Sequence, residues 1–343
     1  MRLVTIRPIV GDWATGAAHR PAAVLPSGRF LPLGALVDVA TTGLPNEIGQ
    51  IELAAVLAVD PDLGGIRDAF AACDPAALEA AAMDPGSVRL MAPIPRPGKI
   101  VGVGYNYIDH IREQGLDRPT RPVLFSMFAN AVVPDGEPIR RPAGTHALDL
   151  EAELAVVIGR RACRVAAADG LAHVAGYTVA NDVTARDWQG QARALRPGEK
   201  GDGQWLRAKG SDTFLPLGPM LVTADELGDG RGLAVRSWRT AASGPDAGRS
   251  FPMQDGNTSD LLFSVAELIS IISHEVTLDP GDVIVTGTPS GVGVFREPQI
   301  FLEPGDVVRV EVERIGSLTN PVTDADGRAP EGSPAARFMG GRP

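Results

Sequence analysis

The segment 149–158 carries the residues best suited to chemistry in this sequence. It reads Asp-Leu-Glu-Ala-Glu-Leu-Ala-Val-Val-Ile, and its apolar second half predicts a strand. Because strand side chains alternate between two faces, Glu151 and Glu153 would share one face and the apolar residues the other. Neighbouring carboxylates repel unless something compensates them. The pair therefore indicates either a solvated strand edge or a site for a hard cation such as Mg²⁺, which binds carboxylate oxygens.

A third carboxylate shifts this balance toward a cation. Asp182 stands where the predicted strand 177–180 ends in a polar turn, and packed apolar residues behind a strand end make a rigid mount for a ligand. Further along the turn, Asp187 has Arg186 beside it, and we expect a simple ion pair between these two neighbours.

A possible general base follows the predicted strand 99–104. His110 and Glu113 are three residues apart, so they would share one face of a helix. A carboxylate beside a histidine orients the imidazole and raises its basicity, which suits a general base. The same spacing is common in surface ion pairs, so this motif alone leaves both interpretations open.

The composition excludes several classes of protein. The chain has 343 residues, 44% of them hydrophobic, and a net charge of −10, which gives no general attraction to nucleic acid or anionic membrane. Cys73 and Cys163 provide neither a disulfide framework nor the spacing of a zinc site. No apolar run is long enough to span a membrane, and the first residues lack a signal peptide's pattern. We therefore expect a cytoplasmic protein that acts on a small molecule.

The elements that must position these residues fall into two units. Residues 1–92 predict a small α+β domain, with short strands at 3–6 and 22–25 and alanine-rich helices near 47–58 and 76–83. A proline-dense connector follows. We expect the boundary there, with a small N-terminal domain at 1–92 and a catalytic domain at 93–343.

The second unit predicts a mainly β architecture with some α. One clear helix begins at Ser264, where Ser264 and Glu267 form a capping box. The turn sequences 279–282 and 303–306 each lead directly into a strand. The tail after Gly316 is rich in Gly, Pro and Ala, and we expect it to be loosely held. Strands are predicted at 99–104, 154–158, 177–180, 220–223, 283–286 and 307–312.

Five motifs, in order along the chain, resemble the fumarylacetoacetate hydrolase family. The resemblance covers roughly residues 96–314 with no block missing, and it is similar to the longer bacterial members related to acylpyruvate hydrolases. Any one motif would be weak evidence, whereas five in sequence are specific. They occupy Gly104–Glu113, Asp149–Gly159, Gly176–Gln189, Lys209–Pro219 and Leu278–Gly293.

The resemblance implies a rolled mixed β-sandwich in the catalytic domain, usually in a homodimer. It implies a Mg²⁺ or Mn²⁺ ion held by Glu151, Glu153 and Asp182. His110 and Glu113 match the dyad that activates water. The remaining matches lie at positions that contact the substrate or its oxygens: Tyr105, Asn106, Gln189, Lys209 and Thr288.

Two positions depart from the family pattern. Asn106 stands in the region where fumarylacetoacetate hydrolases proper carry an extra metal-binding Asp, which favours the acylpyruvate-hydrolase branch. Met127 occupies a place where many members have a lysine, and the lost cation argues against a doubly acidic substrate. Loops 191–203 and 241–250 are expected to set specificity.

These expectations combine into a metal-dependent hydrolase of a 1,3-dicarbonyl or acylpyruvate-type 2-oxo acid. His110, oriented by Glu113, would activate a water that attacks the distal carbonyl, and Lys209 would stabilise the developing negative charge. The same apparatus could serve a decarboxylase, isomerase or dehydratase of a related 2-oxo acid. A non-catalytic metabolite-binding protein would not need all of these groups together.

Overall fold

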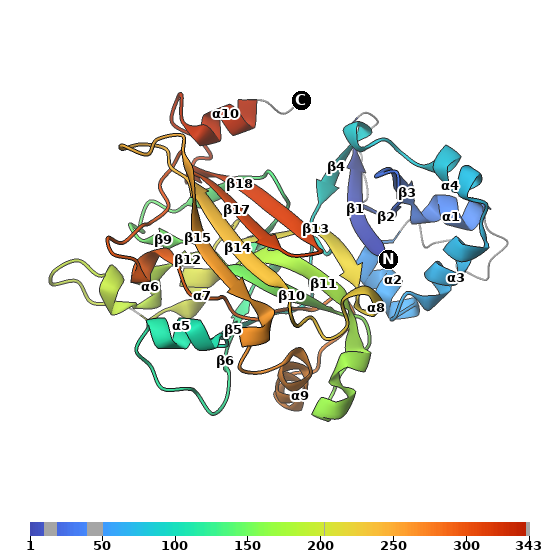
Figure 1. The fold of residues 1–343 in the computed structure, drawn as a ribbon, viewed down its shortest axis with the longest axis horizontal. Helices are drawn as coiled ribbons and strands as arrows, with labels where there is room; N and C mark the ends of the chain where they lie inside the picture. Colours follow the sequence, from blue (N-terminus) through green and yellow to red (C-terminus); the bar gives the residue numbers. More distant parts are fainter. Residues whose placement is uncertain (10–18, 40–50, 202, 341–343) are drawn as a thin grey trace.

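Two β-sheets form the frame of the protein (Figure 1). The computed structural model describes residues 1–9, 19–39, 51–201 and 203–340. Within these ranges the larger sheet has 11 strands, in the order β3-β2-β1-β13-β11-β10-β16-β5-β6, with β4 beside β1 and β7 beside β13. Their bounds are β1 Arg2–Pro8, β2 Arg20–Val24, β3 Phe30–Pro32, β4 Val88–Met91, β5 Ile100–Gly104, β6 Val123–Met127, β7 Val132–Val133, β10 Ala152–Ile158, β11 Val174–Asn181, β13 Leu215–Thr223 and β16 Val283–Val285.

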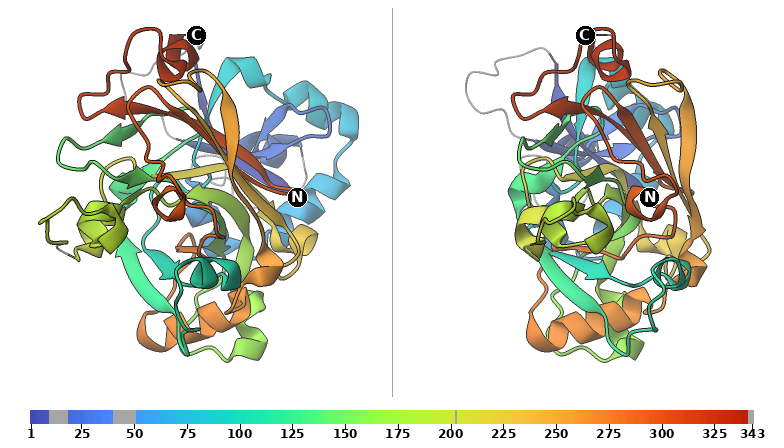
Figure 2. Two further views of the ribbon diagram at one scale, coloured as in Figure 1. Left: turned by 60° about the vertical axis from the view of Figure 1, so that its left-hand side comes forward. Right: turned by 90° about the vertical axis from the view of Figure 1, so that its left-hand side faces the viewer.

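The smaller sheet lies in front of the larger one in Figure 1, and the two share an apolar core (Figures 1 and 2). Its order is β15-β14-β17-β18-β8, and a separate short pair joins β9 to β12. These strands are β8 Ile139–Arg141, β9 Leu148–Asp149, β12 Thr184–Ala185, β14 Ala234–Thr240, β15 Ser250–Asn257, β17 Val307–Val312 and β18 Gly316–Asp324. The helices are α1 Leu33–Val39, α2 Leu53–Val59, α3 Gly64–Ala72, α4 Pro75–Ala81, α5 Ile108–Glu113, α6 Arg186–Gln189, α7 Trp205–Lys209, α8 Ala224–Leu227, α9 Val265–Glu275 and α10 Pro334–Gly340.

Strand β10 lies between two apolar cores and is buried along its whole length. Its Leu154 and Val156 belong to the core between the two sheets, as their alternation predicts. Ala155 and Val157 face the opposite way, into a core that also contains residues of α2 and α3. Because both faces are packed, the start of β10 is a rigid support for the side chains placed there.

The N-terminal segment contributes strands to the larger sheet. Strand β1 pairs with β13, with Arg2 opposite Val222, and α1 to α4 gather at one end of the molecule (Figure 1). Strands 3–6 and 22–25 and the helix near 76–83 lie where the sequence predicts them. The start of the helix expected near 47–58 lies outside the described residues, and α2 covers 53–59. The domain boundary after residue 92 stays a prediction.

The catalytic unit follows most of the sequence predictions, with one correction. The capping box of Ser264 and Glu267 is confirmed at the start of α9. The start of the segment after Gly316 is not loosely held: β18 pairs with β17 over residues 316–321 and with β8 over residues 322–324, and Leu318 and Val322 are fully buried. Gly316 and Pro321 obscure this strand in the sequence, although the alternating Leu318 and Val322 mark its core face.

Candidate active site

Three carboxylates meet where β10 begins and β11 ends. Ala152 pairs with Asn181 across these strands, so Glu151 and Glu153 lie beside Asp182. Backbone contacts fix the junction, since the Asp182 N–H donates to the Glu151 carbonyl at 2.9 Å. One carboxylate oxygen from each of the three lies within 4.8 Å of the others, and all three residues are buried. We call Glu151, Glu153 and Asp182 the acidic triad.

Two buried cations contact the acidic triad. Lys209, at the end of α7, places Nζ 2.5 Å from Glu151 Oε2 and 2.6 Å from Asp182 Oδ2. Arg186 places Nη2 2.7 Å from Glu151 Oε1, while its Nε donates to Asp149 at 3.0 Å. Burial disfavours the charged form of Lys209, but Asp182 and Glu151 outweigh it and raise the pKa of Lys209.

The carboxylates of the triad differ in their surroundings. Burial alone would raise the pKa of Glu151, but Lys209 and Arg186 lower it to about 2. Burial and the two neighbouring carboxylates raise the pKa of Glu153 well above its usual range. Burial, with the Glu151 charge, raises the pKa of Asp182 to about 7 despite Lys209. Three carboxylates thus face two cations, and the raised pKa values of Glu153 and Asp182 reflect burial together with the charge that these cations leave uncompensated.

The donor atoms of the acidic triad fit a hard divalent cation. All are carboxylate oxygens, the ligands that Mg²⁺ and Mn²⁺ prefer. Asp182 Oδ1 is buried and has no hydrogen-bond partner in the protein. A native structure seldom leaves such an atom unsatisfied without a functional reason. Glu151, Glu153 and Asp182 would hold the cation, as the resemblance implies.

The His110–Glu113 pair forms on α5 as the spacing predicts. His110 Nδ1 lies 2.9 Å from Glu113 Oε2, and the other Glu113 oxygen accepts from the Gly291 N–H at 2.9 Å. Asp109 accepts from the Ser290 N–H at 3.1 Å and from its hydroxyl at 2.8 Å. The loop after β16 thus holds α5 in place, and the His110 ring lies edge-on to Phe295.

The same loop also contacts the acidic triad. The Gly287 N–H donates to Glu153 Oε2 at 2.6 Å. Gly287 has φ +99°, and a Cβ there would lie 2.9 Å from the Asn106 Cβ, so a side chain is excluded. The Thr288 hydroxyl donates to the Ala152 carbonyl at 3.0 Å and accepts from Gln254 at 2.7 Å. One loop therefore joins the dyad to the triad.

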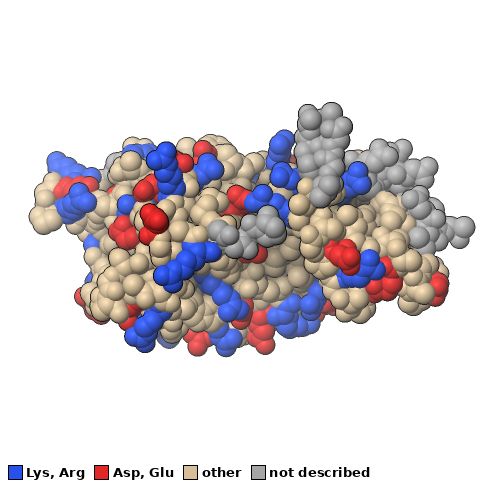
Figure 3. Space-filling view, turned by 90° about the horizontal axis from the view of Figure 1, so that it is seen from above, with Lys and Arg blue, Asp and Glu red and all other residues tan. Residues whose placement is uncertain are grey.

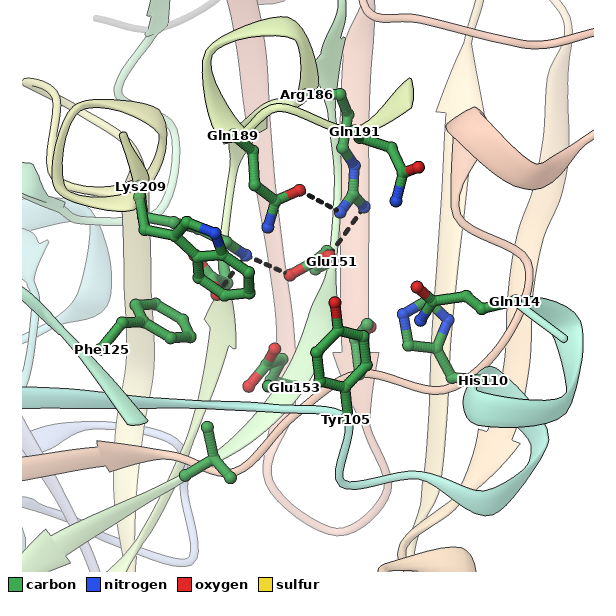
Figure 4. A pocket seen from close by; sticks show the side chains of 15 residues that line it. Tyr105, His110, Gln114, Phe125, Glu151, Glu153, Arg186, Gln189, Gln191 and Lys209 are labelled. Carbon is green, nitrogen blue, oxygen red and sulfur yellow. Dashed lines mark hydrogen bonds and ion pairs between the residues drawn. The ribbon is translucent and has the colours of Figure 1, made fainter. Parts of the chain in front are cut away.

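A small chamber of about 40 Å³ brings most of the predicted residues together (Figure 4). Lys209 and Phe125 lie on one side of the glutamates, and His110 with Gln114 lies on the other. Gln189 accepts a hydrogen bond from Arg186 Nη1 at 3.3 Å. The predicted residues that line the chamber are Tyr105, His110, Glu151, Glu153, Asp182, Gln189, Lys209 and Thr288.

The chamber wall does not include the predicted site residues Glu113 and Asn106, nor Met127, which departs from the family pattern. Glu113 stands behind His110 and orients it. Asn106 is buried, and its amide bonds the backbone of Thr286 at 2.7 Å and of Phe263 at 2.8 Å. Its predicted contact with substrate stays a prediction. Met127 is buried in the apolar core and does not line the chamber.

The sequence reasoning missed Arg186 as a site residue. The expected Arg186–Asp187 ion pair is wrong, because both residues lie in the first turn of α6, where the side chains of consecutive residues do not face each other. Asp187 instead accepts from the Thr145 hydroxyl at 2.6 Å and the His146 N–H at 3.1 Å. Four further lining residues lie outside any motif with an assigned role: Gln114, Phe125, Gln191 and Trp205.

The model of a known family matches the part of the chain that builds this site. Residues 99–323 match the family described as "Fumarylacetoacetate (FAA) hydrolase C-terminal". This chain belongs to the fumarylacetoacetate hydrolase family. Its two-sheet architecture is the fold of that family, as the solved structures below also show. The resemblance drawn from the five motifs is confirmed.

Curated relatives share the catalytic region. "Oxaloacetate tautomerase fahd2, mitochondrial" of Xenopus laevis is 44% identical over 236 residues, which is 69% of each chain. "Oxaloacetate tautomerase FAHD2A, mitochondrial" of Homo sapiens is 44% identical over 235 residues, covering 68% of this chain and 69% of the relative. The fumarylacetoacetate hydrolase family relationship thus extends to proteins named as tautomerases, and this chain belongs to a family of enzymes.

Solved structures of two bacterial proteins cover almost the whole chain. Fumarylacetoacetate hydrolase from Exiguobacterium antarcticum is 29% identical with a TM-score of 0.72, covering 94% of this chain and 99% of the other. The 5-carboxymethyl-2-hydroxymuconate delta-isomerase from Mycobacterium smegmatis is 33% identical with a TM-score of 0.65, covering 94% of this chain and 99% of the other.

Within the described ranges, no helix has the length and apolar character needed to span a bilayer.

Proposed function

We propose that this protein catalyses keto–enol tautomerisation of 2-oxo acids that carry a second carbonyl carbon at C4, the class that includes oxaloacetate. The observation that carries this proposal is His110, held by Glu113 at 2.9 Å in the wall of the chamber that contains the acidic triad. Relatives that are 44% identical and named oxaloacetate tautomerases support it.

The residues of the chamber divide the work of such a reaction. A divalent cation on the acidic triad would act as a Lewis acid toward the 2-oxo acid head. Because Nδ1 of His110 faces Glu113, Nε2 is the atom that exchanges a proton with substrate. Nε2 removes a proton from C3, the C–H electron pair forms the C2–C3 double bond, the π pair of the C2 carbonyl moves onto its oxygen, and the proton is returned to that oxygen. The Lys209 ammonium stabilises the negative charge that develops there.

Hydrolysis of a C–C bond is the second candidate function. The observation that favours it is a wider cavity of about 530 Å³ outside the chamber, with room for a water and a longer acyl group. His110 would take a proton from that water, the hydroxide would add to the C4 carbonyl, and the C3–C4 electron pair would leave on C3. The products would be a carboxylic acid and a smaller 2-oxo acid.

Both functions can be tested with the full chain. We expect Mg²⁺-loaded protein to accelerate the ultraviolet change that accompanies conversion of enol-oxaloacetate to the keto form, and chelation to abolish the acceleration. Acylpyruvates in the same cuvette report hydrolysis through release of pyruvate. Full activity in both assays after exhaustive chelation would overturn the metal-dependent proposal, and pyruvate release alone would favour the hydrolase.

We further propose that the protein is a homodimer and binds no nucleic acid. Lys and Arg are interspersed with Asp and Glu on the face shown in Figure 3, which supports the second part. Light scattering should give twice the chain's 35.9 kDa. The curated relatives carry "mitochondrial" in their names, and the cytoplasmic location of this chain stays a prediction.

A further inference from the structure

A second, wider cavity lies directly outside the chamber of the acidic triad. Its volume is about 530 Å³, against about 40 Å³ for the chamber. We call it the tail cavity. The two spaces adjoin each other, because they share five lining residues: Tyr105, Gln114, Gln189, Gln191 and Trp205. A molecule whose 2-oxo acid head lies at the triad would extend its C4 substituent into the tail cavity.

The polar groups in the wall of the tail cavity are mostly uncharged. Gln114, Gln189 and Gln191 each offer a carboxamide, which can donate or accept a hydrogen bond. Among the described lining residues, Arg193 carries the one charge. Its Nε donates to the Val294 carbonyl at 3.1 Å, and its Nη2 pairs with the Glu297 carboxylate. The cation therefore already has one carboxylate partner in the protein.

The apolar part of the wall consists of flat surfaces. Tyr105, Trp205 and Phe295 all line the tail cavity. Trp205 is held by Phe125, with ring centroids 5.3 Å apart. Aromatic rings of this kind bind planar groups by stacking and burial of apolar area. An anionic tail would lose its hydration here without gaining an unpaired cation, which is unfavourable.

We propose that the tail cavity selects 2-oxo acids that extend beyond C4 with an uncharged, flat group, such as an aryl or amide group, over those that extend there with an anionic group. Oxaloacetate ends at C4, so this selection does not act on it. This proposal rests on the function proposed above and specifies the substrate class. Selectivity arises because the carboxamides and rings replace water around a neutral planar group but not around a carboxylate.

Stable mimics of the head separate the two proposals. Oxamate carries the 2-oxo acid head alone, N-benzyloxamate adds a flat neutral tail, and N-oxalylglycine adds an anionic tail. Binding of each is measured by titration calorimetry on Mg²⁺-loaded full-length protein. We expect N-benzyloxamate to bind about tenfold more tightly than oxamate, from burial of the ring, and N-oxalylglycine to bind no more tightly than oxamate.

Each failure has its own pattern. No Mg²⁺-dependent binding of oxamate would overturn the proposed function and, with it, the selectivity. Binding of oxamate with no gain from the benzyl group would overturn the tail cavity alone. Tighter binding of N-oxalylglycine than of N-benzyloxamate would also overturn it, because the cavity would then prefer an anion.

Two variants test the wall directly. Trp205→Ala should remove most of the benzyl gain, measured within the variant as the ratio of its N-benzyloxamate affinity to its oxamate affinity. Gln191→Arg adds an uncompensated cation and should raise N-oxalylglycine affinity about tenfold. Gln204→Arg is the matched control, because Gln204 is exposed and lies outside both cavity walls. Equal gains in Gln191→Arg and Gln204→Arg would show a general charge effect and overturn the assignment.

Discussion

Buried acids occur in two contrasting settings in this protein. The turns 279–282 and 303–306, here called the aspartate turns, each end in a fully buried carboxylate. Asp282 accepts from the Asp279 and Lys99 backbones, both at 2.7 Å, and pairs with Lys99 Nζ at 2.7 Å. Asp306 repeats this pattern with the Glu303 backbone at 2.9 Å and Arg239 Nε at 2.6 Å.

The acidic triad lacks this complete set of partners. It places three carboxylates against Lys209 and Arg186, and Asp182 Oδ1 has no hydrogen-bond partner. The aspartate turns are satisfied by donors from their own turn and a neighbouring strand, so they stabilise the fold. The triad keeps one buried oxygen without a partner and raised pKa values at Glu153 and Asp182, which is the pattern expected of a functional site. The difference separates structural from functional acids more clearly than burial does.

The largest expected effect comes from removing one charge of the triad. Glu153→Gln should lower turnover by at least about 10³-fold, since it removes a ligand of the Lewis acid. The unfolding midpoint of the metal-free variant should be unchanged or higher, because repulsion among the carboxylates is relieved. Calorimetric titration with Mg²⁺ and thermal unfolding in chelator measure the two effects.

The matched control for this prediction is the neighbouring ligand. Glu151→Ala should also abolish turnover but should destabilise the protein, because it leaves Lys209 and Arg186 buried without their shared partner. If Glu153→Gln lowered the unfolding midpoint as much as Glu151→Ala, the triad would be a structural cluster like the aspartate turns.

The next effect concerns the dyad beside the triad. His110→Ala should reduce turnover by about 10²–10⁴-fold, the usual contribution of general acid–base catalysis. Mg²⁺ affinity should remain, since the triad lies on other strands. Steady-state kinetics on the best substrate measure the loss, and His274→Ala, an exposed histidine on α9, is the control. A wild-type rate in His110→Ala would reduce the dyad to an ion pair without function.

The aspartate turns should respond in stability and not in metal binding. Asp306→Ala should lower the free energy of unfolding by about 3 kcal/mol, because it leaves Arg239 and two backbone N–H groups without their acceptor. Chemical denaturation measures the loss. Asp246→Ala, at a half-exposed position in the loop 241–250, should change stability by less than about 0.5 kcal/mol. Loss of Mg²⁺ affinity in Asp306→Ala would break the separation between the two settings.

Sequence patterns predicted the parts of the site that lie on regular elements. Strand alternation placed Glu151 and Glu153 together, and helical spacing placed Glu113 against His110. The repeated turn sequences predicted the aspartate turns. They did not predict the groups that bind the turn carboxylates, because neighbouring strands supply those partners. Local patterns extend over a few residues, so they locate elements better than long-range contacts.

The partners that were missed come from short or irregular elements. Arg186 reaches Glu151 only because α6 turns it away from its neighbour Asp187, and no periodicity reveals a four-residue helix. Gln191 belongs to the loop 191–203, which was expected to set specificity, but its place in the cavity wall depends on tertiary contacts, such as its N–H bond to the Arg186 carbonyl at 3.0 Å. Strand β18 was missed because Pro321 interrupts its pattern, although its core residues alternate.

The smallest expected effect concerns Glu267, a carboxylate near the surface whose hydrogen-bond donors lie three residues before it in the chain. The Ser264 hydroxyl and backbone N–H hydrogen-bond Glu267 at the start of α9, and these bonds lower the pKa of Glu267. Ser264→Ala should cost about 1 kcal/mol of unfolding free energy at pH 7, the usual value of an N-cap.

A depressed carboxyl pKa gives stability that is present above the unfolded value of about 4.5 and is lost as the pH falls through the folded value. The loss of unfolding free energy in Ser264→Ala, measured by urea denaturation, should therefore shrink between pH 5 and pH 3. The control is Thr258→Ala, which removes a buried hydroxyl that accepts from the Leu233 N–H and contacts no carboxylate. Its loss of unfolding free energy should be the same at both pH values. If the loss of unfolding free energy in Ser264→Ala stayed constant across this range, the whole effect would come from the hydrogen bond between the hydroxyl and the backbone, and none from the Glu267 carboxylate.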